Sequence, residues 1–134
     1  MISRRTLRKN AIAIIYNHLM TGKTIDEILE DNNFSVTISD FIEPLDLDEE
    51  LLDACYRVEE RLDIYVPVIN SQLKGNWRFD RLGMMEQAIL AFALAELEQS
   101  IQDKTVIVNE AIELAKIYCD KDAYKLINGV LDSL

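Results

Sequence analysis

The residues best suited to bind another molecule lie at the start of the chain: Arg4, Arg5, Arg8 and Lys9. Residues 1–25 carry five basic side chains and no acidic one. An arginine forms two parallel hydrogen bonds with a phosphate and stacks on bases. The positive end of a helix dipole also attracts anions. The types and spacing of these residues predict a nucleic-acid-binding surface on the first helix.

A helical projection places these basic residues beside an apolar face. At about 100° per residue, the side chains within about 60° of Arg5 are Arg8, Lys9, Ile12 and Tyr16. The apolar side, centred more than about 100° away, holds Leu7, Ala11, Ile14 and Ile15. We therefore expect Arg5 and Arg8 to face solvent, and Tyr16 to be free to stack or to anchor a partner. The alternative is a solvated basic terminus that pairs with acidic residues, with Tyr16 packed under the acidic loop.

Charge is distributed unevenly along the chain. The net charge of −10 by itself argues against nucleic-acid binding, because it repels phosphate. However, residues 26–64 carry 14 acidic side chains against two arginines, whereas the first 25 residues are basic. The sequence thus predicts a basic N-terminus attached to an acidic body.

No arrangement of residues predicts catalysis or a bound cofactor. The sequence has neither a P-loop nor the glycine-rich and serine-centred motifs of dinucleotide-binding proteins and hydrolases. Its single histidine, His18, is interpreted as a half-buried, hydrogen-bonded side chain. The carboxylate pairs Glu96/Glu98 and Glu110/Glu113 are interpreted as solvated helix faces. We therefore expect a protein that is not an enzyme.

The cysteines do not predict a metal site. Cys55 and Cys119 are far apart, with no CxxC pair and no cluster of cysteine and histidine. Zinc usually takes about four nitrogen or sulfur ligands. We expect two reduced, half-buried thiols.

The elements that must position these residues are all predicted to be helices. Helical periodicity covers residues 3–20, resumes at 24 and at 48, covers 84–99 and 105–119, and resumes at 120. The expected caps and breaks are Ser3, Gly22, a Thr24–Glu27 capping box, a kink at Pro67, and Thr105. Residues 31–46 have no regular pattern. The predicted architecture is all-α, a single compact domain over residues 1–134 with about seven helices.

The apolar run Ala88–Ala95 is too short for a membrane, since a spanning helix needs about 20 residues. It is interpreted as a buried core helix. The N-terminus lacks the apolar segment of a signal peptide. We expect a cytoplasmic protein with no membrane contact.

Three segments have longer, specific patterns. The C-terminal third reads VIVNEAIELAK at 106–116 and DAYKLINGVL at 122–131. The N-terminus reads RRTLR at 4–8, followed by Ala11 and Tyr16, and the centre contains Trp77, RL at 81–82 and EQAIL at 86–90. Together these segments resemble the family of the transcription antitermination factor NusB. The similarity is weakest over residues 22–50.

This resemblance implies two small helical bundles and a role in transcription antitermination. It implies binding of single-stranded boxA RNA of ribosomal RNA transcripts, together with a NusE-like small-subunit ribosomal protein, in an antitermination complex on RNA polymerase. By position, the RNA-binding residues are Arg4, Arg5, Arg8, Lys121, Asp122 and Lys125, and the helical projection adds Lys9 to them. Tyr16 and Glu86 match positions that face the NusE-like partner.

Two departures from the family pattern bear on function. Leu126 stands where the family has phenylalanine, which removes an aromatic group that could stack on a base. Asp103 replaces a proline before the VIVNEAIELAK helix. The alternative function is therefore a protein-binding helical module with the same fold and little affinity for RNA.

Overall fold

The structure, a computed structural model, describes residues 3–31 and 47–134. Every regular element in these ranges is helical: α1 (Arg4–Thr21), α2 (Ile25–Glu30), α4 (Glu49–Gln72), the 3-10 turn η1 (Phe79–Arg81), α5 (Met84–Gln99), α6 (Lys104–Tyr118) and α7 (Lys121–Asp132). The all-α prediction is confirmed, with six α-helices and one 3-10 turn in the described part of the chain. The irregular segment predicted at 31–46 falls, after its first residue, outside the described residues.

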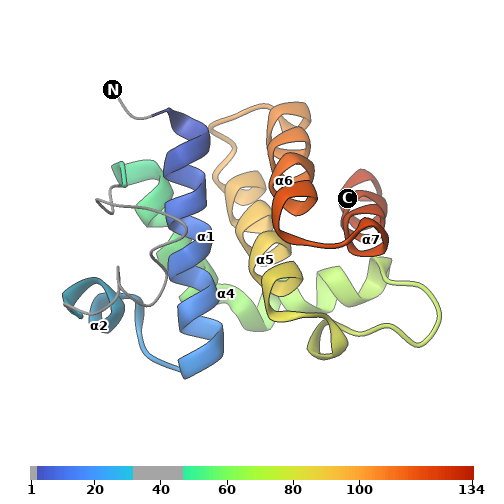
Figure 1. Ribbon diagram of the computed structural model, residues 1–134, viewed down its shortest axis with the longest axis horizontal. Coiled ribbons are helices and arrows are strands. Elements are labelled where there is room, and N and C mark those ends of the chain that lie inside the picture. The colour runs from blue at the N-terminus through green and yellow to red at the C-terminus, as the bar shows by residue number, and fades with distance from the viewer. Residues whose placement is uncertain (1–2, 32–46) are drawn as a thin grey trace.

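Helix α5 forms the centre of the fold. Its residues from Ala88 to Ala93 are all buried, as expected for a helix that is apolar around its whole circumference. It packs against α1 and α4 and against α6 and α7. Figure 1 shows α5 between α1 on one side and α6 and α7 on the other. Helices α1 and α4 form one small group and α6 and α7 form the other, and both groups share α5 as their core helix.

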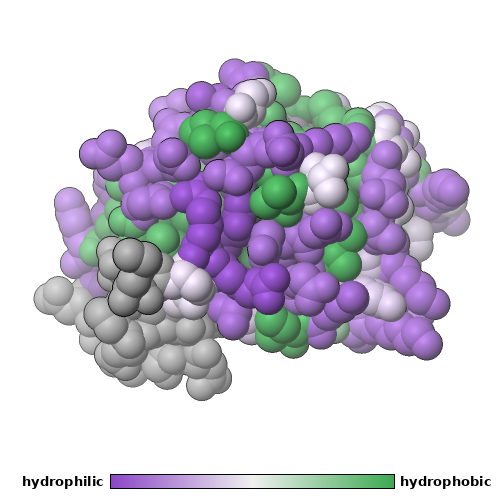
Figure 2. Space-filling model, turned by 90° about the horizontal axis from the view of Figure 1, so that it is seen from above, coloured by the Kyte–Doolittle hydropathy of each residue, from purple (hydrophilic) through white to green (hydrophobic). Residues whose placement is uncertain are grey.

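The surface shows no continuous apolar face from the direction drawn in Figure 2. Hydrophilic side chains cover most of this side, and apolar residues appear as separate patches. Among the described residues, no helix is both long and apolar enough to cross a membrane.

The first two helices begin and end where the sequence predicts. The Ser3 hydroxyl accepts a hydrogen bond from the Thr6 N–H at 3.2 Å. Gly22 ends α1 with a φ of 77°, a conformation that glycine adopts without steric cost. Thr24 and Glu27 form both hydrogen bonds of a capping box, each 3.1 Å long. These caps fix the direction in which α1 passes into α2.

The predicted cap of α6 is wrong. The helix begins at Lys104, and the residue at its N-cap is Asp103, whose ψ of 144° is extended. Thr105 already lies inside the helix, so its hydroxyl cannot act as the cap.

The predicted kink of α4 occurs elsewhere than at Pro67. The helix continues through Pro67 and departs from helical geometry at Arg61, with φ −121° and ψ 15°. A proline ring presses on the carbonyl four residues earlier, here that of Asp63. The distortion therefore falls on the N-terminal side of the proline, where the chain can adjust.

The Glu98 carboxylate ties the bend of α4 to the end of α5. It accepts hydrogen bonds from the Tyr65 hydroxyl at 2.7 Å, from Arg61 Nε at 2.9 Å and from Arg57 Nη1 at 3.2 Å. These donors, Tyr65 first, lower the pKa of Glu98 below its ordinary value of 4.5. Glu98 is exposed, as the interpretation of a solvated helix face predicts, but its carboxylate is also held by these three donors.

A group whose pKa is lowered by folding stabilises the folded state above its unfolded pKa, and this stabilisation is lost as the pH falls through the folded pKa. Since the pKa of Glu98 is lowered below 4.5, its contribution should be lost progressively as the pH falls below that ordinary value. We expect Glu98→Gln to lower stability at pH 7 and to lose less further stability between pH 5 and pH 3 than the parent protein. Urea denaturation across this range measures the difference. Parallel curves for the two proteins would contradict the role given to Glu98.

Candidate nucleic-acid interface

Two of the predicted arginines lie at the exposed N-terminal end of α1. Arg5 is 48% exposed and donates to Glu110 of α6 through Nε at 2.9 Å. Arg4 bridges Asp48 at 2.7 Å and Glu50 at 2.9 Å, at the start of α4. We call Arg4, Arg5 and the half-buried Lys9 the arginine end. Its arginines are held by acidic neighbours, and surface ion pairs of this kind exchange readily because they stabilise by about 0–1 kcal/mol.

Arg8 does not face solvent, which corrects the helical projection. Its side chain is 4% exposed, and it donates to the equally buried Glu96 through Nε at 2.9 Å and Nη2 at 3.0 Å. The interpretation of Glu96 as a solvated carboxylate is therefore wrong. Arg8 thus forms a buried ion pair that joins α1 to α5, and its guanidinium is not available to RNA.

The projection failed because it assumed that α1 has one buried side. The helix packs against α2, α4 and α5. Residues from Asn10 to Ile15 are therefore all buried, including Ile12, which the projection places on the side of the basic residues. Tyr16 is half-buried and packs against the core, so the prediction of a freely exposed tyrosine is wrong.

His18 has the structural role predicted for it. It is half-buried, and its Nδ1 lies 2.5 Å from the Lys23 carbonyl oxygen, beyond the end of α1. This contact holds the turn that Gly22 begins.

The second group of predicted residues lies on α7. Lys121, Asp122 and Lys125 are all exposed. Arg5 pairs with Glu110 of α6, whereas Lys121 follows the C-terminal end of that helix. Figure 1 shows the start of α1 and the α6–α7 turn at opposite ends of α6. The structure therefore divides the predicted RNA-binding residues between two ends of the molecule.

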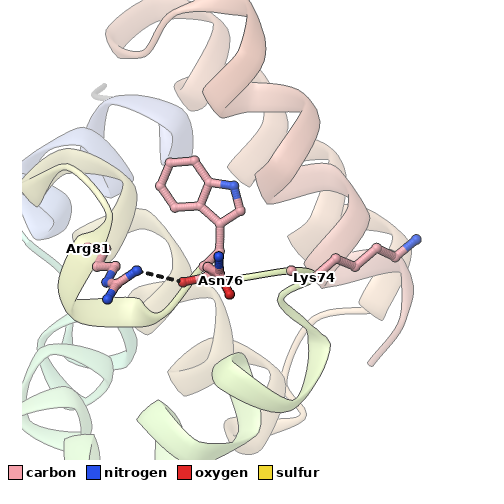
Figure 3. A pocket seen from close by; sticks show the side chains of 5 residues that line it. Lys74, Asn76 and Arg81 are labelled. Carbon is pink, nitrogen blue, oxygen red and sulfur yellow. Dashed lines mark hydrogen bonds between the residues drawn. The ribbon is translucent and has the colours of Figure 1, made fainter.

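The loop after α4 adds basic and aromatic residues beside α7. Lys74, Asn76, Trp77 and Arg81 line a hollow of about 650 Å³. In Figure 3, Lys74 and Arg81 extend to opposite sides of the loop, and Arg81 Nη1 donates to the Asn76 carbonyl at 3.2 Å. A smaller hollow of about 250 Å³ joins Lys74 and Trp77 to Lys125 and Leu126. We call Lys74, Trp77, Arg81 and Lys125 the tryptophan surface.

In the sequence, Trp77 stands out only as part of a family pattern. The indole is 49% exposed, which is unusual for so large an apolar group. A tryptophan among lysines and arginines outside the helical pattern is a signal that could have revealed the surface. Leu126 lines the same hollow, at the position where the family has phenylalanine. Trp77 is therefore the one aromatic side chain among the described residues that line this hollow.

A third hollow, of about 300 Å³, has the opposite charge. Its lining includes Glu86, Asp120 and Asp122, and it shares Trp77 and Arg81 with the first hollow. The Glu86 side chain folds back over Gly83, where an added Cβ would lie 2.5 Å from Oε2. A cationic group suits this hollow better than phosphate does.

Tyr16 and Glu86 fall at the same end of the α1–α5 pair. The Arg8–Glu96 contact fixes the antiparallel register of these helices. Eight residues further along α1, Tyr16 comes opposite the start of α5, in which Glu86 occupies the first turn. The two residues assigned to a protein partner are thus positioned to share one contact surface.

The thiols have no feature of a reactive or metal-binding site. Burial raises the pKa of Cys55, which is fully buried, rather than half-buried as predicted. Burial also raises the pKa of the half-buried Cys119 to about 12, with nearby Glu86 and Asp120 contributing. In the described ranges, no three cysteine, histidine or acidic side chains are grouped as metal ligands.

Known proteins match the chain over its length. The model of the NusB family matches residues 5–134. A transcription antitermination protein NusB from Staphylococcus carnosus (strain TM300) is 35% identical, over 99% of each chain. One from Sulfurovum sp. (strain NBC37-1) is 30% identical, over 100% of this chain and 98% of its own. A solved structure of antitermination factors NusB and NusE in complex with dsRNA has the same fold, with a TM-score of 0.78, 22% identity, and coverage of 97% of this chain and 93% of its own.

Proposed function

Because the chain belongs to the NusB family, we propose that it is an RNA-binding adaptor of transcription antitermination. It binds boxA-type single-stranded RNA of ribosomal RNA transcripts together with a NusE-like small-subunit ribosomal protein. The joint complex then acts on RNA polymerase. The observation that carries this proposal is the match to NusB relatives across the whole chain.

In this proposal the two basic surfaces contact the RNA backbone. Arg5 and Lys9 supply phosphate contacts at the arginine end, with Arg4 once its acidic partners release it. Lys121 and Lys125 supply contacts on α7, where Asp122 can accept a hydrogen bond from a base amino group. Arg8 has a positioning role, since its guanidinium is bound to Glu96 inside the fold.

The partner surface is assigned to Tyr16, Glu86 and the acidic hollow. The carboxylates of Glu86, Asp120 and Asp122 favour a basic protein. Docking there neutralises charge that otherwise repels RNA. We also propose that the protein is not an enzyme and that it acts in the cytoplasm, where transcripts of bacterial ribosomal RNA are made.

We expect the isolated protein to bind boxA-type RNA weakly, with micromolar affinity or weaker, and the basic partner to tighten the complex. Each phosphate contact steepens the salt dependence by roughly 0.7 in log–log slope for single strands. Few cations of this chain are free to contact phosphate, while acidic groups act over a Debye length of about 8 Å. Fluorescence anisotropy of labelled RNA over a salt series, with and without the partner, measures affinity and slope. The joint complex should show the tighter binding and the steeper slope.

Nanomolar binding by the protein alone, or no gain with the partner, would overturn this division of labour. Absence of RNA binding in both arms, with the partner still bound, would favour the alternative of a protein-binding module. An RNA of equal length with a scrambled boxA segment is the matched control for sequence preference.

A further inference from the structure

The hollow between Trp77 and α7 combines an apolar floor with a cationic rim. Leu73 and Val130 are buried at its base, while Lys74 and Lys125 are exposed at its edge. Trp77 stands at the border of this hollow and of the larger one beside Asn76 and Arg81. The acidic hollow also reaches Trp77, so three hollows meet at one exposed indole, two of them lined without acidic side chains.

The charges around these cavities distinguish them from the acidic hollow. Two of the cavities beside Trp77 have no lining residue from α5. Their lining includes two lysines and one arginine but no acidic side chain. In a chain of net charge −10, this combination favours an anionic ligand over a basic protein. Flat apolar space for a base beside cations for its phosphates is the combination that single-stranded nucleic acids require.

Gly129 supplies a second, independent observation. It lies within α7 and lines the same hollow, and a Cβ built on it would meet no atom within 4 Å. Glycine in a helix interior is less favourable than alanine, so the fold gains nothing from the missing side chain. The space beside its Cα is open to a ligand.

We infer that the hollow lined by Trp77, Gly129 and Lys125 receives a base of single-stranded RNA, which stacks on the Trp77 indole. Lys125 and Lys74 contact the adjoining phosphates, and the cavity beside Asn76 and Arg81 takes the neighbouring nucleotide. This inference rests on the proposed function and adds to it a base-binding site that joins the loop after α4 to α7.

The sole tryptophan gives a direct readout of this site. Titration of the full protein with boxA-type RNA should quench the Trp77 emission in parallel with the anisotropy of labelled RNA. Trp77→Ala should weaken RNA binding about tenfold or more, since stacking of one base contributes about that factor. Ile117→Ala, which removes an equally exposed apolar group from α6, is the matched control and should bind RNA normally.

Gly129→Ala and Gly129→Leu place a side chain in the open space and so test whether RNA occupies it. Gly129→Ala should raise the melting temperature or leave it unchanged, because it replaces a helical glycine and its Cβ meets no atom within 4 Å. The melting curve of Gly129→Leu is measured alongside. Both should weaken RNA binding, the leucine variant more. Asn128→Ala is the matched control, since it improves the same exposed helix and does not line the hollow.

The outcomes separate this inference from the proposed function. RNA binding by the parent protein with unchanged Trp77 emission, or with normal affinity in Trp77→Ala and Gly129→Leu, would overturn the base-binding site alone. Loss of partner binding with unchanged RNA affinity in Trp77→Ala would instead assign the indole to a protein interface and overturn it too. No RNA binding by the parent protein, with or without partner, would overturn the proposed function.

Discussion

Arg8→Ala is expected to destabilise the fold by about 3–5 kcal/mol, because it leaves the buried Glu96 carboxylate without its partner. Both side chains are 4% exposed, so water cannot replace the lost hydrogen bonds. For a chain of this size the melting temperature should fall by roughly 8 °C or more. Urea denaturation followed by circular dichroism measures the free energy of unfolding.

Arg5→Ala is the matched control for Arg8→Ala. Its side chain is 48% exposed, and exposed ion pairs contribute about 0–1 kcal/mol, so stability should change little. Arg8→Met combined with Glu96→Leu should recover much of the loss, since it removes both buried charges together. Equal stability of Arg8→Ala and Arg5→Ala would show that the buried pair does not support the fold. RNA affinities of Arg8 variants are meaningful only where the fold is retained.

Tyr16→Ala with Glu86→Ala is expected to weaken binding of the NusE-like partner by tenfold or more and to leave binding of RNA alone nearly constant. Tyrosine buries a large area at an interface with little loss of rotamer entropy, and it is enriched among residues that dominate binding energy. Glu86 adds an acidic contact for a basic partner. Isothermal titration with the partner and with RNA separates the two effects.

Since Tyr16 packs against the core, Tyr16→Ala also affects the stability of the fold. Glu86→Lys alone keeps Tyr16 in place and reverses the charge, so it should weaken partner binding with a small effect on melting. Glu113→Lys, on α6, serves as the charge-matched control. An equal loss of RNA binding in the Glu86 variants would show that the partner and RNA surfaces are not separate.

Local features of the fold were predictable, because they depend on residues close in sequence. Ser3, Gly22 and the Thr24–Glu27 box determine helix ends through contacts within four residues. The apolar run of α5 likewise predicted a buried helix from composition alone. At each of these caps, the partner that satisfies the capping group lies in the same segment.

The position of Arg8 was not predictable, because its partner lies 88 residues away. A helical projection gives the relative directions of side chains but does not show how many neighbours surround the helix. The same reason explains the errors at Ile12 and Glu96, which both meet residues of another helix. The tryptophan surface also depends on tertiary structure. Its residues come from the loop that follows α4 and from α7, and these two segments meet only in the folded protein.

The position of α5 has a consequence for how the protein comes apart. Helices from both halves of the sequence use its surface as their common support: α1 and α4 from one half, α6 and α7 from the other. Removing either half would expose to water the apolar residues of α5 that the missing helices cover. The two helical groups should therefore unfold together in one cooperative transition, and a proteolytic cut between them should not release two folded pieces. The proposed RNA and partner surfaces would thus belong to one unit that folds and unfolds as a whole.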